Sequence, residues 1–232
     1  MNETESLIFY GISYIEALGK LNESLPESVY AIHCVLDRIH TDPGYHLGIY
    51  IEEPSEDDAP SHACDQSWFH CYQGKEEPIM RRPYSPLKWR DGDNDNMLYL
   101  RFTFGMFDHL TIEQSKMGAW QAYLLCISKT ILPFSGGLYY TKRKLIFTKD
   151  QLQTANPFWL WKPNEQIKNL QVDLSPSVSI NGNQMIVSCC YWSDWKGLVR
   201  ENLQLSISED GKAKIGDFHD EILFKYNCGI RF

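Results

Sequence analysis

The sequence lacks an excess of positive charge. Its 22 lysines and arginines are outnumbered by 30 aspartates and glutamates, which gives a formal net charge of −8. Proteins that bind nucleic acid or an anionic membrane surface need a basic patch, so both classes of partner are disfavoured. An acidic chain of this kind is either an ordinary cytoplasmic protein or a binder of something basic.

Several catalytic and cofactor motifs are also missing. The sequence has no G-x-S-x-G elbow, no H-E-x-x-H zinc motif, no papain-type cysteine motif and no phosphate-binding glycine loop. Residues 91–95 resemble the first half of a calcium loop, but Asn96 and Phe102 stand where that loop needs glycine and glutamate. We therefore predict that the protein uses no cofactor.

Signals for export and membrane insertion are missing as well. Residues 1–5, Met-Asn-Glu-Thr-Glu, are acidic where a secretory signal would be basic. The stretch 111–131 contains too many polar residues for a membrane span. The seven cysteines include no C-x-x-C pair, which favours free thiols in a reducing compartment. These features predict a cytoplasmic protein with no membrane partner.

The strongest pattern that is present is a helix followed by a strand. Thr111 and Gln114 have capping-box spacing, and apolar residues then recur at steps of three and four. These are Met117, Trp120, Tyr123, Leu124, Ile127 and Ile131. Pro133 ends the pattern, and residues 138–147 are rich in aromatic and branched side chains. We predict a helix over 111–131 at the centre of the core, followed by a strand.

Other segments carry weaker patterns. Ile8, Ile12, Ile15 and Leu18 keep helical spacing and predict a helix over 6–21. A second capping-box pattern, from Thr148 to Gln151, predicts a short helix. Strands are expected at 30–36, 45–51, 67–72 and 97–104, and the first two are expected to pair across a turn at 41–44.

The carboxyl-terminal part of the chain predicts an antiparallel meander. Asn181-Gly182 separates strand-like runs at 178–180 and 184–191, and further runs follow at 198–207 and 222–226. The fold class expected is α+β, with an antiparallel or mixed sheet of hairpins and this meander packed against the central and amino-terminal helices. We predict one domain over 1–232, with a loop-rich insertion at about 53–96.

Two groups of residues suggest a surface that binds another protein. One is an acidic run and the other is a set of tryptophans near predicted turns, and tryptophan is enriched at interface hot spots. The residues are Glu52, Glu53, Glu56, Asp57, Asp58, Trp159, Trp161 and Trp195. We predict a non-enzymatic protein-binding factor with a basic protein partner. Its most concrete form is a bacterial immunity-type inhibitor of a basic toxin, and the oligomeric state is left open.

An enzyme is the alternative hypothesis. Five of the seven histidines lie between residues 33 and 71, and His62, Cys64, His70 and Cys71 could supply a zinc site or a thiol nucleophile for a hydrolase. Their spacing matches no standard zinc motif, and neighbours on a strand point to opposite faces. A structural subunit of a larger assembly is a third class, which an exposed apolar patch would indicate.

Two smaller charged clusters have plainer interpretations. Residues 142–144, Lys-Arg-Lys, are expected to place Arg143 on the opposite face of a strand from both lysines, so we interpret them as an exposed face plus one ion pair. Asp217, Asp220 and Glu221 surround His219 and are expected at a polar turn between strands.

Overall fold

The computed structural model describes residues 1–20, 32–53, 66–73, 79–83, 106–131, 143–155, 167, 169–193 and 196–226, without the side chains of 50–53, 66–68, 79–83 and 129–131. The fold is α+β, as the sequence predicts. Among the described residues, no helix is both long and apolar enough to cross a membrane.

The largest element is a five-stranded sheet built around a carboxyl-terminal meander. Its strands are β6 (Lys144–Ile146), β7 (Ser177–Asn181), β8 (Gln184–Ser193), β9 (Gly197–Ile207) and β10 (Ala213–Lys225). Strands β10, β9 and β8 pair antiparallel in that order. Both β7 and β6 pair antiparallel with the remaining edge of β8, β7 with residues 184–188 and β6 with residues 190–192. The predicted meander is confirmed.

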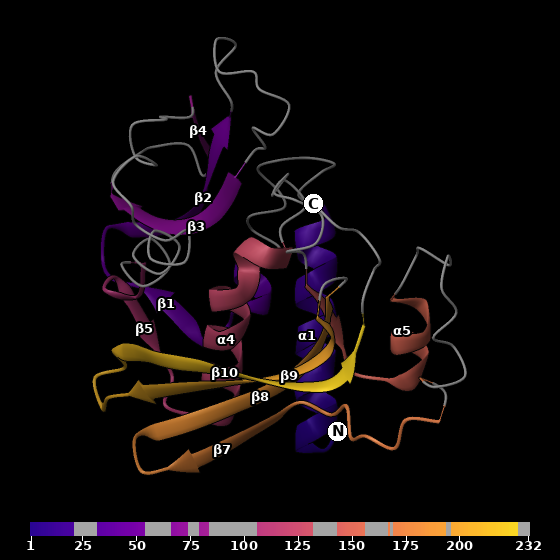
Figure 1. Cartoon of the computed structure of the whole chain (residues 1–232). Coiled ribbons are helices and arrows are strands. Elements are labelled where there is room, and N and C mark those ends of the chain that lie inside the picture. Colours follow the sequence, from indigo (N-terminus) through magenta and orange to yellow (C-terminus); the bar gives the residue numbers. More distant parts are fainter. Residues whose placement is uncertain are drawn as a thin grey trace.

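Two smaller sheets complete the strand structure. A two-stranded sheet pairs β1 (Ile39–Thr41) with β5 (Leu110–Ile112), and a three-stranded sheet has β2 (Tyr45–Glu53) between β3 (Gln66–Gln73) and β4 (Ile79–Pro83). Strand β2 is antiparallel to β3 and parallel to β4. Figure 1 shows this three-stranded sheet in purple, away from the orange and yellow meander.

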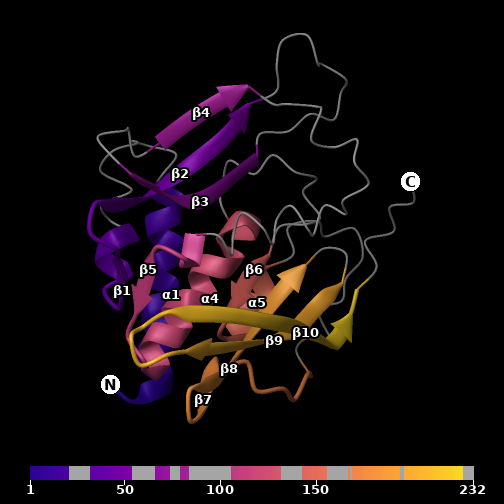
Figure 2. The same ribbon diagram turned by 90° about the vertical axis from the view of Figure 1, so that its left-hand side faces the viewer.

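The two long helices pack between these sheets. Helix α4 (Lys116–Ile131) contacts β7, β8 and β9 of the large sheet, β3 of the three-stranded sheet, and helix α1 (Glu3–Lys20). Figures 1 and 2 both show α1 beside α4. The main hydrophobic core forms where α1 and α4 meet the inner face of the sheet, with Tyr14, Trp120 and Val187 fully buried.

A second hydrophobic cluster covers the opposite face of one end of the large sheet. Helix α5 (Lys149–Thr154) contributes Leu152, and the sheet contributes Ile146, Trp192 and Leu198. Strand β8 is therefore buried on alternate residues in its first half but on both faces from Cys189 to Ser193. One end of the sheet is covered twice and the other end has one face open to solvent.

A buried ion pair fixes β6 to the covered end of this sheet. Glu201 on β9 is 1% exposed, and its carboxylate accepts hydrogen bonds from Arg143 Nη1, at 2.6 Å to Oε1, and from Tyr123 Oη at 3.2 Å. Burial raises the pKa of Glu201, while the charge of Arg143 acts in the opposite direction. The guanidinium also lies 4.5 Å from the centre of the Tyr191 ring. Lys144 is exposed, so the predicted exposed face with one ion pair is confirmed at residues 143–144.

Some local predictions are wrong. Residues 32–35 are helical, and β1 pairs with β5 rather than with β2, so the predicted hairpin from 30 to 51 does not form. The turn predicted at 41–44 does form, and in it the Tyr45 N–H donates to Asp42 O at 2.9 Å. The acidic residues 217, 220 and 221 lie on β10 and not at a turn. Within the predicted loop-rich insertion, β3 confirms the strand expected at 67–72, whereas β4 is a strand that the sequence analysis did not predict.

Candidate functional site

Most residues of the sequence-predicted binding surface lie outside the described residues. The backbone of Glu52 and Glu53 ends strand β2, but their side chains are not described. The remaining predicted positions, Glu56, Asp57, Asp58, Trp159, Trp161 and Trp195, fall in segments that the structure does not describe. The predicted surface therefore stays a prediction.

Of the alternative enzyme residues, the structure places His70 and Cys71, which are consecutive on β3; His62 and Cys64 lie outside the described segments. Cys71 packs against the main core, and burial raises the pKa of its thiol to about 12. A thiol that is protonated at neutral pH is a poor nucleophile, which disfavours a catalytic role for Cys71. No group of three histidine, cysteine, aspartate or glutamate side chains that could hold a metal occurs among the described residues.

The other described cysteines divide into buried and exposed thiols. Cys126, Cys189 and Cys190 are buried, and burial raises the pKa of each thiol, which fits packing rather than reactivity. Cys34 is exposed on the helical turn 32–35, where the sequence predicts a strand.

A small cavity brings together part of the histidine-rich region. It has a volume of about 440 Å³, with His33, Asp37 and His40 at its walls and Leu47 and Leu110 among its apolar lining. The His33 ring and the Asp37 carboxylate already have protein partners. His33 Nε2 lies 3.2 Å from Leu47 O, and the Asp37 carboxylate accepts a hydrogen bond of 2.7 Å from Gln121 Nε2. This cavity therefore offers no pair of free catalytic groups.

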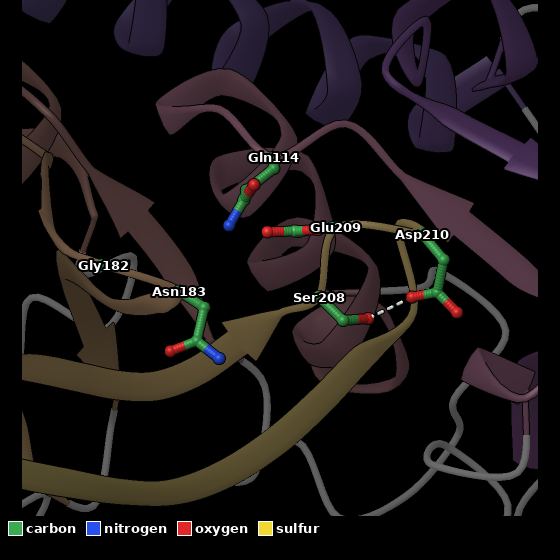
Figure 3. A pocket seen from close by; sticks show the side chains of 6 residues that line it. All are labelled: Gln114, Gly182, Asn183, Ser208, Glu209 and Asp210. Atoms are coloured by element: carbon green, nitrogen blue, oxygen red, sulfur yellow. Dashed lines mark hydrogen bonds between the residues drawn. The ribbon is translucent and has the colours of Figure 1, made fainter.

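A larger pocket lies where the tips of two hairpins approach the start of α4 (Figure 3). Its volume is about 680 Å³. The lining residues are Gln114, Gly182, Asn183, Ser208, Glu209 and Asp210. Two carboxylates and two amides line it, and no lysine or arginine is among the described lining residues.

Local backbone chemistry shapes both hairpin tips. Asn181 pairs with Gln184, so Gly182 is the first of two loop residues, and its φ of 64° suits a type II′ turn. In the β9–β10 tip, Gly211 N–H donates to Ser208 O at 2.9 Å, and the Ser208 hydroxyl donates to the Asp210 carboxylate. These bonds hold the second tip in one conformation.

Ile207 ties the two sides of the pocket together. Its N–H donates to Asn183 O at 3.0 Å, and its carbonyl accepts a hydrogen bond of 3.1 Å from Gln114 Nε2. The Gln114 amide nitrogen thus donates within the protein, and the amide oxygen can accept a hydrogen bond from a ligand. Figure 3 shows the Glu209 side chain beside Gln114 at this opening.

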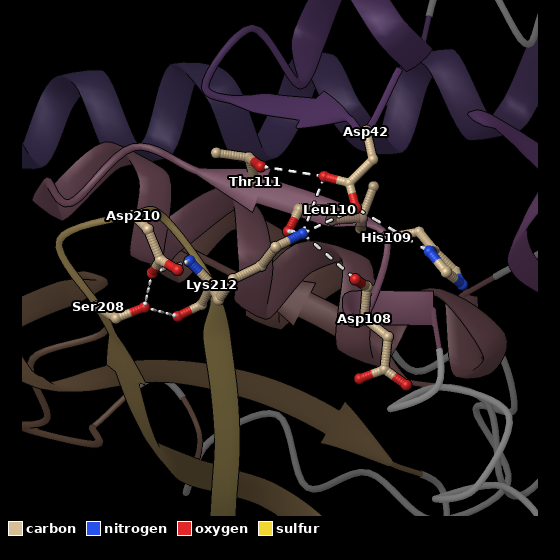
Figure 4. A network of polar contacts seen from close by, with 8 residues as sticks. All are labelled: Asp42, Asp108, His109, Leu110, Thr111, Ser208, Asp210 and Lys212. Atoms are coloured by element: carbon tan, nitrogen blue, oxygen red, sulfur yellow. Dashed lines mark hydrogen bonds and ion pairs between the residues drawn. The ribbon is translucent and has the colours of Figure 1, made fainter. Parts of the chain in front are cut away.

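Lys212 follows the acidic tip, but its ammonium group is directed elsewhere (Figure 4). Its Nζ donates to both oxygens of Asp42, at 2.8 and 2.9 Å, and to the carbonyls of Asp108 and Leu110. These bonds hold the pKa of Asp42 below its ordinary value and tie the β9–β10 hairpin to the β1–β5 sheet. The charge of Lys212 is thus taken up by Asp42 and not by Glu209.

The pocket is consequently an acidic one. The hydrogen bond from Ser208 lowers the pKa of Asp210, so this carboxylate is ionised at neutral pH. Glu209 is exposed, and no ion pair to it occurs in the described part of the chain. A negative pocket lined by hydrogen-bond acceptors suits an ammonium or guanidinium group.

Sequence reasoning identified each of these segments but missed the pocket. Glu209-Asp210-Gly211 and Asn181-Gly182 are readable as turns, and Gln114 as a helix-start residue. The pocket exists because three segments far apart in the chain meet at one place, and no local pattern encodes that meeting. The one available signal was a turn with two consecutive carboxylates.

Comparison with protein-family models, with curated proteins and with solved structures gave no match to this chain.

Proposed function

We propose that this chain is a non-enzymatic, cytoplasmic factor that binds a basic protein, with a bacterial immunity-type inhibitor of a basic toxin as its most concrete form. The observation that carries the proposal is the hairpin-tip pocket, where Glu209 lies beside the oriented amide of Gln114 and Asp210 also contributes to the lining (Figure 3). A lysine or arginine side chain of the partner fits this pocket in charge and in hydrogen bonding.

The charge of the whole chain supports the same partner. A net charge of −8 attracts a basic protein over long distances and raises the rate of encounter. The pocket then provides a contact with defined geometry, since the turn bonds and the Ile207 bridge hold its lining in place before binding. A thiol hydrolase, the alternative function, gains no support from Cys71, whose thiol stays protonated at neutral pH.

The pocket can be tested with a minimal cationic ligand. In a ¹H–¹⁵N NMR titration with acetyl-arginine amide, we expect shifts at the side-chain amides of Gln114 and Asn183 and at the backbone amide of Gly182. Glu209→Gln should weaken these shifts about threefold or more, because it removes an unpaired carboxylate. Asp150→Asn on α5 makes the same change in net charge and should have little effect.

Binding to a basic macromolecular probe extends the test. A fluorescent oligolysine peptide should bind the wild-type chain at low ionic strength and dissociate as salt is added. Glu209→Gln should weaken that binding more than Asp150→Asn does. If acetyl-arginine amide and oligolysine leave the pocket signals unchanged, the proposed function is wrong.

A further inference from the structure

Helix α1 has two faces with different roles. At 100° per residue, Leu7, Gly11, Tyr14 and Leu18 fall on one side, and all four are buried. The opposite side carries Glu5, Phe9, Glu16 and, at the end of the helix, Lys20, and all four are exposed. The inner face is fully used by the core, so the outer face is not needed for packing.

Phe9 is the unusual residue on this outer face. Its side chain is 56% exposed, and it is the only exposed phenylalanine, tyrosine or tryptophan in the described part of the chain. Its ring meets the Tyr10 ring edge-to-face, with 5.8 Å between ring centres. Phenylalanine is also a weaker helix former than the lysine, glutamate or glutamine that usually fill a solvent-facing helix position. Neither packing nor helix propensity explains this side chain.

The charges around Phe9 limit what could cover it. Glu5 and Glu16 lie on the same side of the helix, about one turn before the ring and two turns after it. Glu3 forms a 2.8 Å ion pair with Lys116 and belongs to the contact between α1 and α4, so it is not part of this surface. The Glu5 carboxylate already accepts the Asn2 N–H at 2.8 Å. No described residue bonds to the Glu16 carboxylate, so an apolar partner would desolvate that carboxylate without compensation, whereas a cationic partner would compensate it.

We infer that the outer face of α1 docks on an arginine-bearing surface of the basic partner. A guanidinium group can stack on the Phe9 ring while its N–H groups bond to the Glu5 or Glu16 carboxylate. Lysine has the charge for the carboxylates but lacks the planar group that stacks on a ring. This inference rests on the proposed function, because it assigns a second contact to the same basic partner and names arginine as the residue recognised.

Paired peptide probes separate stacking from charge. We expect oligoarginine to bind the wild-type chain more tightly than oligolysine of equal length. Phe9→Gln keeps a good helix former at this position. It should weaken the binding of oligoarginine about threefold and leave the binding of oligolysine nearly unchanged. Glu16→Gln should weaken both peptides. Ile186→Gln removes an exposed apolar side chain from the open face of β8 and is the matched control, with no change expected for either peptide.

Three results would overturn the inference. In the first, Phe9→Gln weakens oligoarginine no more than Ile186→Gln does. In the second, Phe9→Gln weakens both peptides equally, which would mean that the ring does not select arginine. In the third, sedimentation equilibrium shows a wild-type dimer that Phe9→Gln dissociates, so the face would be a contact between copies of the chain. The NMR titration of the pocket is independent of Phe9, so it shows whether the proposed function stands when this inference fails.

Discussion

The two ends of the five-stranded sheet use ion pairs in opposite ways. At the covered end, Arg143 meets Glu201 beneath α4, and the Glu201 carboxylate has almost no contact with water. At the open end, Lys212 meets Asp42 at the surface, beside a pocket that keeps unpaired carboxylates. The first pair satisfies charges inside the core. The second pair holds the Lys212 ammonium away from the pocket, so the pocket stays available to a basic partner.

An ion pair of the same kind has different consequences at different depths in the protein. When a buried carboxylate loses its cation, no water can solvate the charge. An exposed carboxylate that loses its cation is solvated by water. The covered end should therefore tolerate few changes, and the open end should tolerate many without unfolding.

The largest effect is expected for Arg143→Met. Without the guanidinium, Glu201 is left buried and unpaired, and we expect the free energy of unfolding to fall by about 3–5 kcal/mol. Urea denaturation of the wild-type and variant chains measures the loss. Arg38→Met is the matched control, because it breaks the surface pair of Arg38 with Glu113, at 2.7 Å, and should have little effect. Equal losses in the two variants would contradict the difference between the ends.

A pair of glycines provides the second test. Gly197 begins β9 at the covered end with a φ of 87°, and a Cβ there would lie 2.2 Å from Phe224 O. Gly182 has a φ of 64° at the open tip, where a Cβ would meet no atom within 4 Å. Gly197→Ala should therefore cost about 2–3 kcal/mol or more, and Gly182→Ala about 1 kcal/mol from backbone strain alone. Thermal denaturation followed by circular dichroism should rank the two in that order.

The third test uses pH, and its effects are the smallest. Removing Arg143 raises the folded-state pKa of Glu201 further, so the folded variant binds a proton before the unfolded chain does. The damage done by Arg143→Met should therefore shrink as the pH falls from neutral to about 5.

Lys212→Met should respond in a different pH range. Asp42 has a lowered pKa when folded, so its contribution is present above the ordinary aspartate range and is lost as the pH falls through the folded value. The difference between wild type and Lys212→Met should stay constant from neutral pH to about pH 5 and shrink only in more acidic solution. Stability curves for both variants at several pH values would show whether the two ranges are separate.

Two matching sequence signatures show how far local patterns reach. Thr148 and Gln151 form the predicted capping box at the start of α5, with both reciprocal hydrogen bonds present. Thr111 and Gln114 have the same spacing, yet Thr111 lies in β5 opposite His40, and the Ser115 hydroxyl accepts the Gly118 N–H at the start of α4. The predicted cap is wrong because pairing with β1, about seventy residues earlier, holds residues 110–112 extended.

Periodicity located α1 but identified its buried face imperfectly. Ile8, Ile12 and Ile15 are half-buried, whereas the face centred on Gly11 is fully covered. A side chain at Gly11 would meet Phe147 at 2.6 Å, so the helix approaches the core most closely where the sequence has no apolar side chain to signal it. An apolar pattern shows which positions carry apolar side chains. It does not show where a residue from another element, such as Phe147, packs against the backbone of a glycine.

The candidate surfaces were less predictable than the fold. Trp120 and Tyr123 of α4 are buried as the periodicity predicts, but residues 118–128 are buried on every side of the helix, including Gln121, which the pattern does not predict. The hairpin-tip pocket depends on the meeting of Gln114, Asn183 and Glu209, and the outer face of α1 depends on which of two helix sides the core covers. Both are set by tertiary packing, which a single sequence shows only indirectly.

One edge of β8 pairs with both β6 and β7, and this arrangement affects the order of folding. Strands β7 to β10 pair with their sequence neighbours across short connections, so they can form from local contacts alone. Strand β6 must find residues 190–192 of β8 from more than forty residues away, and it brings Arg143 to Glu201 as it arrives. We expect the meander to form early and β6 to dock on it late. Changes at Gly182 should then slow folding, whereas changes at Arg143 should mainly speed unfolding.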